Sequence, residues 1–153
     1  SRIVLLKKFS SIGFTFFTNY DSNKGKSISN NNNVCLNFYW PTLEKQIIIK
    51  GNASKISENE SEDYFISRPF GSKIGAIASN QSEVIESREF LEKKFREANN
   101  LYTKITPQRP ENWGGYLVKP LLFEFWQGRK NRLHDRLEFT YEGNIWNANR
   151  LSP

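Results

Sequence analysis

Strand-forming runs occupy both ends of the chain while the stronger helical patterns lie in its middle, and this arrangement constrains the fold more than any other feature. Segments rich in β-branched and aromatic residues alternate with short polar breaks, which is typical of strands. The predicted strands cover residues 3–9, 14–19, 34–40, 45–56, 115–126, 132–142 and 145–150. Many strands with few helices between them indicate a mainly β protein with helical insertions, an α+β barrel, and not a doubly wound parallel sheet.

The breaks between these runs contain residues that favour turns. Ser and Gly at positions 10–13 predict a hairpin between the first two strands. Further turns are predicted at Pro41–Thr42, Gly114–Gly115 and Glu142–Gly143. The polar residues 20–33 predict a loop that contains a short helix near Ser27.

The middle of the chain carries helix signals. Ser57 and Glu60 have the spacing of a capping box, which predicts a helix that runs to about Ser67 and stops before Pro69. A second short helix is expected to follow Ser72 as its N-cap. A third, amphipathic helix is expected over residues 84–99.

Length and composition limit the classes of function. The 153 residues predict one domain over positions 1–153. The net charge of +6 favours an anionic partner, either nucleic acid, an acidic membrane surface or a phosphorylated small molecule, although a solvated basic surface explains it equally well. No apolar run approaches the roughly 20 residues that span a bilayer.

Cysteine, histidine and methionine content adds further limits. The single cysteine, Cys35, excludes an internal disulfide and a cysteine zinc site, and a buried structural thiol is favoured over a catalytic one. One histidine excludes a histidine-rich metal site, so no metal is expected. The chain lacks methionine and begins within a strand-like run, from which we expect that an N-terminal segment is missing.

The stretch YFISRPFGSKIG, residues 64–75, could hold an anion. Tyr64 and Arg68 are four residues apart and share a helix face. Ser72 is expected at the start of the next helix, where free N–H groups attract anions. These groups together predict a phosphate cradle. An ordinary helix cap with an exposed arginine is the alternative.

The stretch FEFWQGRKNRLHDRLEF, residues 123–139, concentrates cations between aromatic side chains. On a strand, Arg132, His134 and Arg136 would share one face, close to the indole of Trp126. Pairing of this row with Glu124, Asp135 or Glu138 is one interpretation. A bound anion or an electron-rich ring is favoured, because odd-numbered neighbours such as Asp135 point to the other face.

The same stretch resembles the C-terminal signature of the pyridoxamine (pyridoxine) 5′-phosphate oxidase family. Further blocks that resemble the family are RIVLLK, FFTN, LEKQI, YFISRPFGSKIG, SNQS, NWGGY and RLSP. The resemblance implies an FMN-binding split β-barrel, a cytoplasmic homodimer with two flavin sites at the subunit interface, and neither nucleic-acid nor membrane binding. It also implies oxidation of pyridoxamine or pyridoxine 5′-phosphate to pyridoxal 5′-phosphate, with oxygen reoxidising the flavin to give hydrogen peroxide.

The resemblance assigns roles to individual residues. The implied flavin contacts, some of them made across the dimer, are Arg2, Ile3, Val4, Leu5, Lys7, Phe17, Thr18, Lys24, Gln46, Gln81, Ser82, Trp126 and Arg136. The implied phosphate clamp for the substrate is Lys7, Tyr64, Arg68 and Ser72. Arg132 and His134 are implied as the catalytic pair that holds the pyridine ring over the flavin.

Two departures from the family pattern concern the flavin. The phosphate loop, usually Ser-Arg-Lys, reads Ser22-Asn23-Lys24, which removes one charge-assisted donor worth ~1.5–3 kcal/mol unless Lys26 replaces it. Phe17 stands where a tyrosine is common. These changes leave a non-catalytic flavin or pyridoxal-phosphate binding protein as an alternative. A basic nucleic-acid binder is a third reading, although no nucleic-acid motif supports it.

Overall fold

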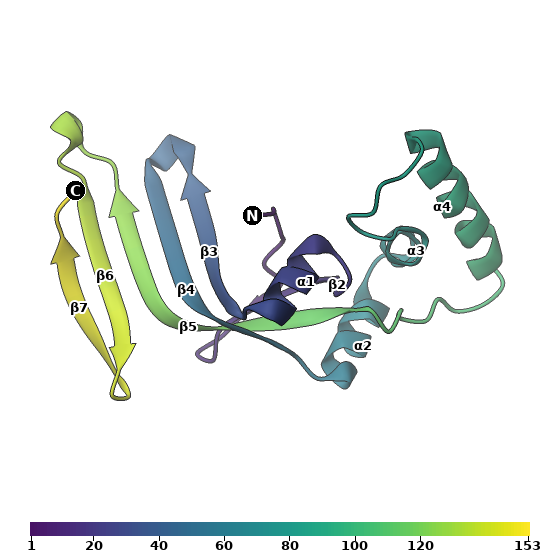
Figure 1. The fold of residues 1–153 in the computed structure, drawn as a ribbon, viewed down its shortest axis with the longest axis horizontal. Coiled ribbons are helices and arrows are strands. Elements are labelled where there is room, and N and C mark those ends of the chain that lie inside the picture. Colours follow the sequence, from purple (N-terminus) through teal and green to yellow (C-terminus); the bar gives the residue numbers. More distant parts are fainter.

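One antiparallel sheet of seven strands runs along the molecule, and three of the four helices gather at one end of it (Figure 1). The computed structural model describes all residues, 1–153. The strands are β1 (Lys8–Phe9), β2 (Phe14–Asn19), β3 (Asn33–Trp40), β4 (Lys45–Lys55), β5 (Trp113–Gln127), β6 (Asp135–Glu142) and β7 (Ile145–Leu151). The helices are α1 (Asn23–Asn30), α2 (Glu58–Ser67), α3 (Phe70–Ala78) and α4 (Arg88–Tyr102).

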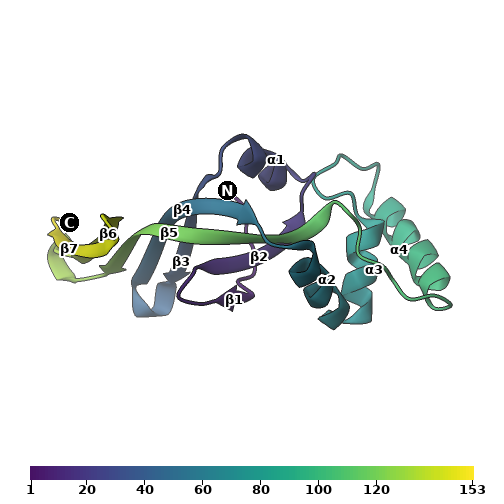
Figure 2. The same ribbon diagram turned by 90° about the horizontal axis from the view of Figure 1, so that it is seen from below.

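The long strand β5 organises the sheet. One of its edges pairs with β4 along almost its whole length. The other edge pairs first with β2, over residues 113–118, and then with β6, over residues 122–127. The β6–β7 hairpin therefore extends the sheet at the end opposite to α2, α3 and α4 (Figures 1 and 2).

The sheet curls where β5 changes partner. Pro120, which has no N–H to give to a ladder, lies in the segment 119–121 that pairs with neither β2 nor β6, although it still faces Gly51 of β4. A register shift between Lys50 and Gly51 adds one residue to β5, which is a β-bulge. Gly51 is required because a Cβ at this position would come 2.1 Å from the carbonyl oxygen of Lys119. The bulge bends the sheet into a half-barrel.

The core is small for a chain of this size. Only 19 of 153 residues are buried, and the central cluster consists of Phe16, Ala53, Tyr116 and Val118. The accessible surface is 10774 Å², whereas a compact monomer of 17.9 kDa exposes about 8,000 Å². Apolar side chains of the C-terminal half contribute to this excess: Leu121, Phe125, Leu133, Leu137, Ile145 and Trp146. The isolated chain thus leaves a large apolar surface uncovered.

Several local expectations are confirmed. The capping box of α2 is present, with the Ser57 hydroxyl accepting from Glu60 N and the Glu60 carboxylate accepting from Ser57 N. The helix ends at Ser67, before Pro69, as the sequence predicts. The short helix near Ser27 is α1. The turn after Glu142 places Gly143 and the following asparagine at positive φ, which suits a tight hairpin.

Other expectations are wrong at their boundaries. Helix α3 begins at Phe70, so Ser72 lies in its first turn and is not its N-cap. Pro69 favours this earlier start because its φ suits a helix entry, and its carbonyl accepts from Ser72 N and Lys73 N. Helix α4 begins four residues later than predicted, after Ser87, whose hydroxyl accepts from Phe90 N.

The strand boundaries also differ from those predicted. The first strand is only Lys8–Phe9, and residues 3–7 make no sheet ladder. Gly114 and Gly115 belong to β5 and form no turn. Glycine is required at these positions because neighbouring atoms approach the backbone closely. A Cβ on Gly114 would lie 2.2 Å from the Tyr20 hydroxyl. Cys35, expected to be buried, is exposed on β3.

Candidate functional site

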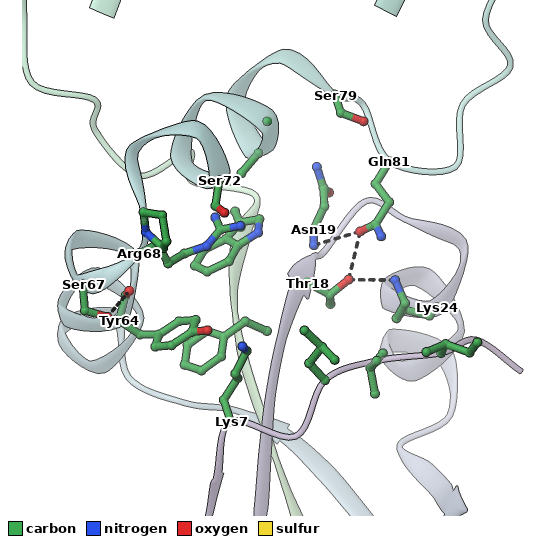
Figure 3. A pocket seen from close by; sticks show the side chains of 18 residues that line it. Lys7, Thr18, Asn19, Lys24, Tyr64, Ser67, Arg68, Ser72, Ser79 and Gln81 are labelled. Atoms are coloured by element: carbon green, nitrogen blue, oxygen red, sulfur yellow. Dashed lines mark hydrogen bonds between the residues drawn. The ribbon is translucent and has the colours of Figure 1, made fainter. Parts of the chain in front are cut away.

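A cavity of about 720 Å³ lies where β2, α2, α3 and the N-terminal segment meet (Figure 3). Its 18 lining residues include three cations, Lys7, Lys24 and Arg68, and no carboxylate. None of these cations forms a salt bridge. The site residues predicted from sequence that line it are Ile3, Val4, Leu5, Lys7, Phe17, Thr18, Lys24, Tyr64, Arg68, Ser72 and Gln81. The cavity is therefore a positively charged chamber without an internal counter-charge.

Arg68 dominates one side of the cavity, next to Ser72 (Figure 3). Pro69 forces the chain out of α2 at this point, so Arg68 is the C-cap residue and its side chain turns inward. Its guanidinium carbon lies 4.5 Å from the centroid of the Trp113 ring. Burial lowers the pKa of Arg68 from its ordinary value. The Nη1 atom is buried and has no hydrogen-bond partner.

Stacked aromatic rings form a wall beside Arg68. The rings of Phe17 and Tyr64 are stacked at 3.8 Å between centroids, and Trp113 lies 5.6 Å from Phe17 in a nearly parallel orientation. The ammonium of Lys7 is 6.0 Å from the Tyr64 centroid. Trp113 received no role from the sequence, although it stands in the block NWGGY that carried the resemblance. Its side chain directly supports the guanidinium.

The opposite side of the cavity carries a hydrogen-bonded polar group (Figure 3). The Oε1 atom of Gln81 accepts from the Thr18 hydroxyl at 3.0 Å and from Asn19 N at 3.2 Å. The Lys24 ammonium donates to the Thr18 hydroxyl oxygen at 2.8 Å. Burial, and secondarily the charge of Arg2, lowers the pKa of Lys24. Lys26 is exposed and does not line the cavity.

Two predicted flavin residues lie next to this chamber and do not line it. Arg2 borders a separate apolar pocket that also contains Cys35. Ser82 directly follows Gln81 and has a left-handed backbone, with φ 77°. Asn19, which the sequence did not single out, lines the chamber through the strand β2 that also carries Thr18.

The remaining predicted residues lie at the other end of the sheet. Gln46 pairs with Trp126, and Trp126 pairs with Arg136 across β4, β5 and β6. The rings of Trp126 and His134 are 4.9 Å apart. His134 Nδ1 accepts from Arg129 N at 3.1 Å. None of these residues lines the cavity described above.

The prediction of one continuous cationic strand face is wrong. Asn131 and Arg132 have left-handed backbones, with φ 57° and 61°, so a single turn of 3₁₀ helix replaces the strand and β6 starts only at Asp135. Arg136 is compensated within the chain, because its Nε lies 2.7 Å from a Glu124 carboxylate oxygen. The alternation of a strand had favoured a bound anion over this pairing with Glu124.

The two groups of residues are too far apart to meet in one chain. Trp113 and Trp126 are thirteen residues apart on β5, which at about 3.3 Å per residue is roughly 40 Å of extended strand. That distance exceeds the reach of a phosphorylated pyridine. Both groups can serve one ligand only if a second copy of the chain supplies one of them.

The curled half-barrel sheet carries uncompensated cations beside an aromatic wall, an arrangement that suits phosphorylated aromatic molecules. A family model described as pyridoxamine 5′-phosphate oxidase matches residues 3–102. A second, described as the pyridoxine 5′-phosphate oxidase C-terminal dimerisation region, matches residues 113–153. The chain belongs to the pyridoxamine 5′-phosphate oxidase family.

Individual relatives agree with this assignment. Proteins named pyridoxine/pyridoxamine 5′-phosphate oxidase from Flavobacterium johnsoniae and Flavobacterium psychrophilum are 58% and 55% identical over 99% and 100% of this chain. The chain spans 72% of the length of each.

Solved structures show the same fold. A crystal structure of PhzG from Burkholderia lata, in complex with tetrahydrophenazine-1-carboxylic acid, superposes with a TM-score of 0.92 at 29% identity, covering 99% of this chain and 74% of that one. An FMN-binding protein from Nostoc punctiforme gives a TM-score of 0.75 at 14% identity, covering 99% of this chain and 79% of its own.

Family membership confirms several expectations from the sequence. The fold is the split barrel of this family, and the chain is an oxidoreductase with FMN as cofactor. The match of residues 113–153 to the dimerisation region agrees with a homodimer and with the apolar surface of the C-terminal half. None of the helices is long and apolar enough to cross a membrane.

Proposed function

We propose that this protein, acting as one domain per subunit in the cytoplasm, oxidises pyridoxamine or pyridoxine 5′-phosphate to pyridoxal 5′-phosphate with FMN as cofactor. The observation that carries the proposal is the buried, unpartnered Nη1 atom of Arg68 in a cavity without carboxylates. A buried donor without a partner costs ~1–3 kcal/mol. A phosphate oxygen of the substrate would remove this cost.

The residues of the chain fit FMN and its phosphate. Lys24, at the start of α1, offers an ammonium to a phosphate, and Ser22 caps that helix. Thr18 and Gln81 supply polar atoms on the same side of the cavity. Bound FMN would supply the acceptor for a hydride from the substrate carbon, with oxygen as the final oxidant and hydrogen peroxide as its product.

The phosphate of the substrate is assigned to the other side. Arg68 and Lys7 would neutralise it, while the hydroxyls of Tyr64 and Ser72 would donate to its remaining oxygens. Trp113 holds the guanidinium from behind and so restricts its orientation. Positioning of this kind lowers the entropic cost of bringing the substrate carbon to the flavin.

The pyridine ring is assigned to the connection between β5 and β6 of the second subunit. Because His134 Nδ1 accepts from Arg129 N, the neutral imidazole carries its proton on Nε2 and offers a donor there. Arg132 lies two residues before His134 and has a left-handed backbone, with φ 61°. Arg136 and Trp126 stand beside this pair and are assigned to the flavin.

The test is turnover by the FMN-loaded dimer under air. Pyridoxine 5′-phosphate should give pyridoxal 5′-phosphate and an equimolar amount of hydrogen peroxide. Pyridoxine without phosphate is the matched control and should react far more slowly, because the clamp has nothing to hold. Binding of the phosphorylated substrate without turnover would overturn the proposal in favour of a non-catalytic binder. Faster oxidation of a carboxylated tricycle, of the kind bound by PhzG, would overturn the substrate class.

A further inference from the structure

Arg109 lies outside the cavity and joins the two elements that form its cationic side. It belongs to the connection between α4 and β5, and its side chain is only 11% exposed. Its Nε atom lies 3.2 Å from Glu62 Oε2 on α2. Its Nη1 atom donates to the backbone carbonyl of Trp113, the first residue of β5, at 2.6 Å.

Both elements held by Arg109 carry parts of the phosphate clamp. Helix α2 carries Tyr64 and has Arg68 as its C-cap residue, and Trp113 supports the Arg68 guanidinium at 4.5 Å. Strand β2 already holds the backbone of Trp113 through its pairing with Asn19. Arg109 adds a bond between the Trp113 carbonyl and α2, so it fixes the position of the indole relative to the helix that leads to Arg68.

We propose that Arg109 is a positioning residue for the phosphate clamp and acts on Arg68 through Trp113. The inference rests on the proposed function for the identity of the bound anion. Arg109 touches neither ligand, because it does not line the cavity. Its guanidinium is suited to the role, since a planar fork can hold Glu62 and the Trp113 carbonyl at once, whereas a lysine ammonium at the same position would reach one of them well.

The experiment measures binding of inorganic phosphate to the FMN-loaded dimer by titration calorimetry, where the flavin phosphate already fills its own site. Arg109→Ala should weaken phosphate binding on the order of tenfold, which corresponds to ~1.4 kcal/mol. Arg109→Lys should give a smaller loss. With pyridoxine 5′-phosphate, KM should rise while kcat changes little. Arg88→Ala is the matched control, because it breaks an exposed Arg–Glu pair on α4.

A double-mutant cycle separates positioning from general damage. In an Arg68→Met background, Arg109→Ala should cause no further loss of phosphate affinity. An equal loss in both backgrounds, or unchanged affinity in Arg109→Ala, would overturn the inference. If Arg109→Ala lost flavin or failed to fold, Arg109→Lys would decide by the same comparison. Phosphate binding does not need turnover. An inactive wild-type protein would therefore refute the proposed function, while the comparison of phosphate affinities would still test the role of Arg109.

Discussion

Replacement of Arg68 by methionine should separate ligand binding from folding. The substitution keeps an unbranched side chain of similar length against Trp113 and removes the guanidinium. With phosphate bound, the variant should lose one or two charge-assisted hydrogen bonds between the guanidinium and the phosphate, each worth ~1.5–3 kcal/mol. A total of about 3 kcal/mol corresponds to phosphate affinity weakened roughly 150-fold.

The ligand-free protein should respond differently. Loss of the cation–π contact with Trp113 costs ~1–2 kcal/mol. Removal of the buried, unpartnered Nη1 atom raises the free energy of unfolding by ~1–3 kcal/mol, so the two effects nearly cancel. Urea unfolding should therefore show a stability within about 1 kcal/mol of wild type.

Calorimetry with inorganic phosphate, steady-state kinetics with pyridoxine 5′-phosphate and urea unfolding together check this prediction. Arg96→Met, on the exposed surface of α4, is the control and should alter none of the three. A variant that was strongly destabilised but kept its phosphate affinity would refute the reasoning, because Arg68 would then serve the fold and not the ligand.

Three other changes give equally direct outcomes. Gly114→Ala should destabilise the protein by ~1–3 kcal/mol in urea unfolding, because the new Cβ would lie 2.2 Å from the Tyr20 hydroxyl. Ser57→Ala should cost ~1 kcal/mol at neutral pH. The Ser57 hydrogen bonds lower the pKa of Glu60 below its ordinary value of 4.5. The stability that these bonds contribute is therefore present above pH 4.5 and is lost as the pH falls through the lowered pKa. The difference in unfolding free energy between wild type and Ser57→Ala should shrink in acid. Leu137→Lys should shift the dimer to monomer in size-exclusion chromatography and release flavin, since this exposed side chain lies on the dimerisation region.

Each of these changes has a control within the chain. Gly71→Ala has open space around its new Cβ and should not destabilise α3. Ser27→Ala removes a hydroxyl that donates within α1 and should show no comparable acid dependence. Glu142→Lys lies at the tip of the β6–β7 hairpin and should leave the dimer intact. A stable Gly114→Ala, a pH-independent Ser57→Ala difference or a dimeric Leu137→Lys would each contradict the corresponding reasoning.

Local signals in the sequence predicted most of the elements. The capping box at Ser57 and the break at Pro69 depend on neighbours within a few residues, and both are visible in the sequence. The start of α3 was misplaced because Ser72 is a good cap by residue type, whereas the fixed φ of Pro69 already starts the helix. Sequence periodicity also could not show that Arg132 has a left-handed backbone, because nothing in its residue type requires it.

The site was predictable only in part. Tyr64 and Arg68 share a face by helical spacing alone, so their side of the cavity follows from the sequence. The support from Trp113 and Arg109 depends on contacts between segments far apart in the chain, which spacing does not encode. The pairing of Arg136 with Glu124 depends on strand register, and the bulge near Gly51 shows how one extra residue changes register.

The length of β5 implies that impaired subunits can repair one another. With the cavity and the β5–β6 connection at opposite ends of one strand, each site of the proposed dimer combines the cavity of one chain with the β5–β6 connection of the other. A chain defective at Arg68 and a chain defective at Arg132 would, when mixed, assemble dimers in which one site carries both lesions and the other carries none. Activity would reappear from two inactive preparations, an outcome excluded if every site were built from a single polypeptide.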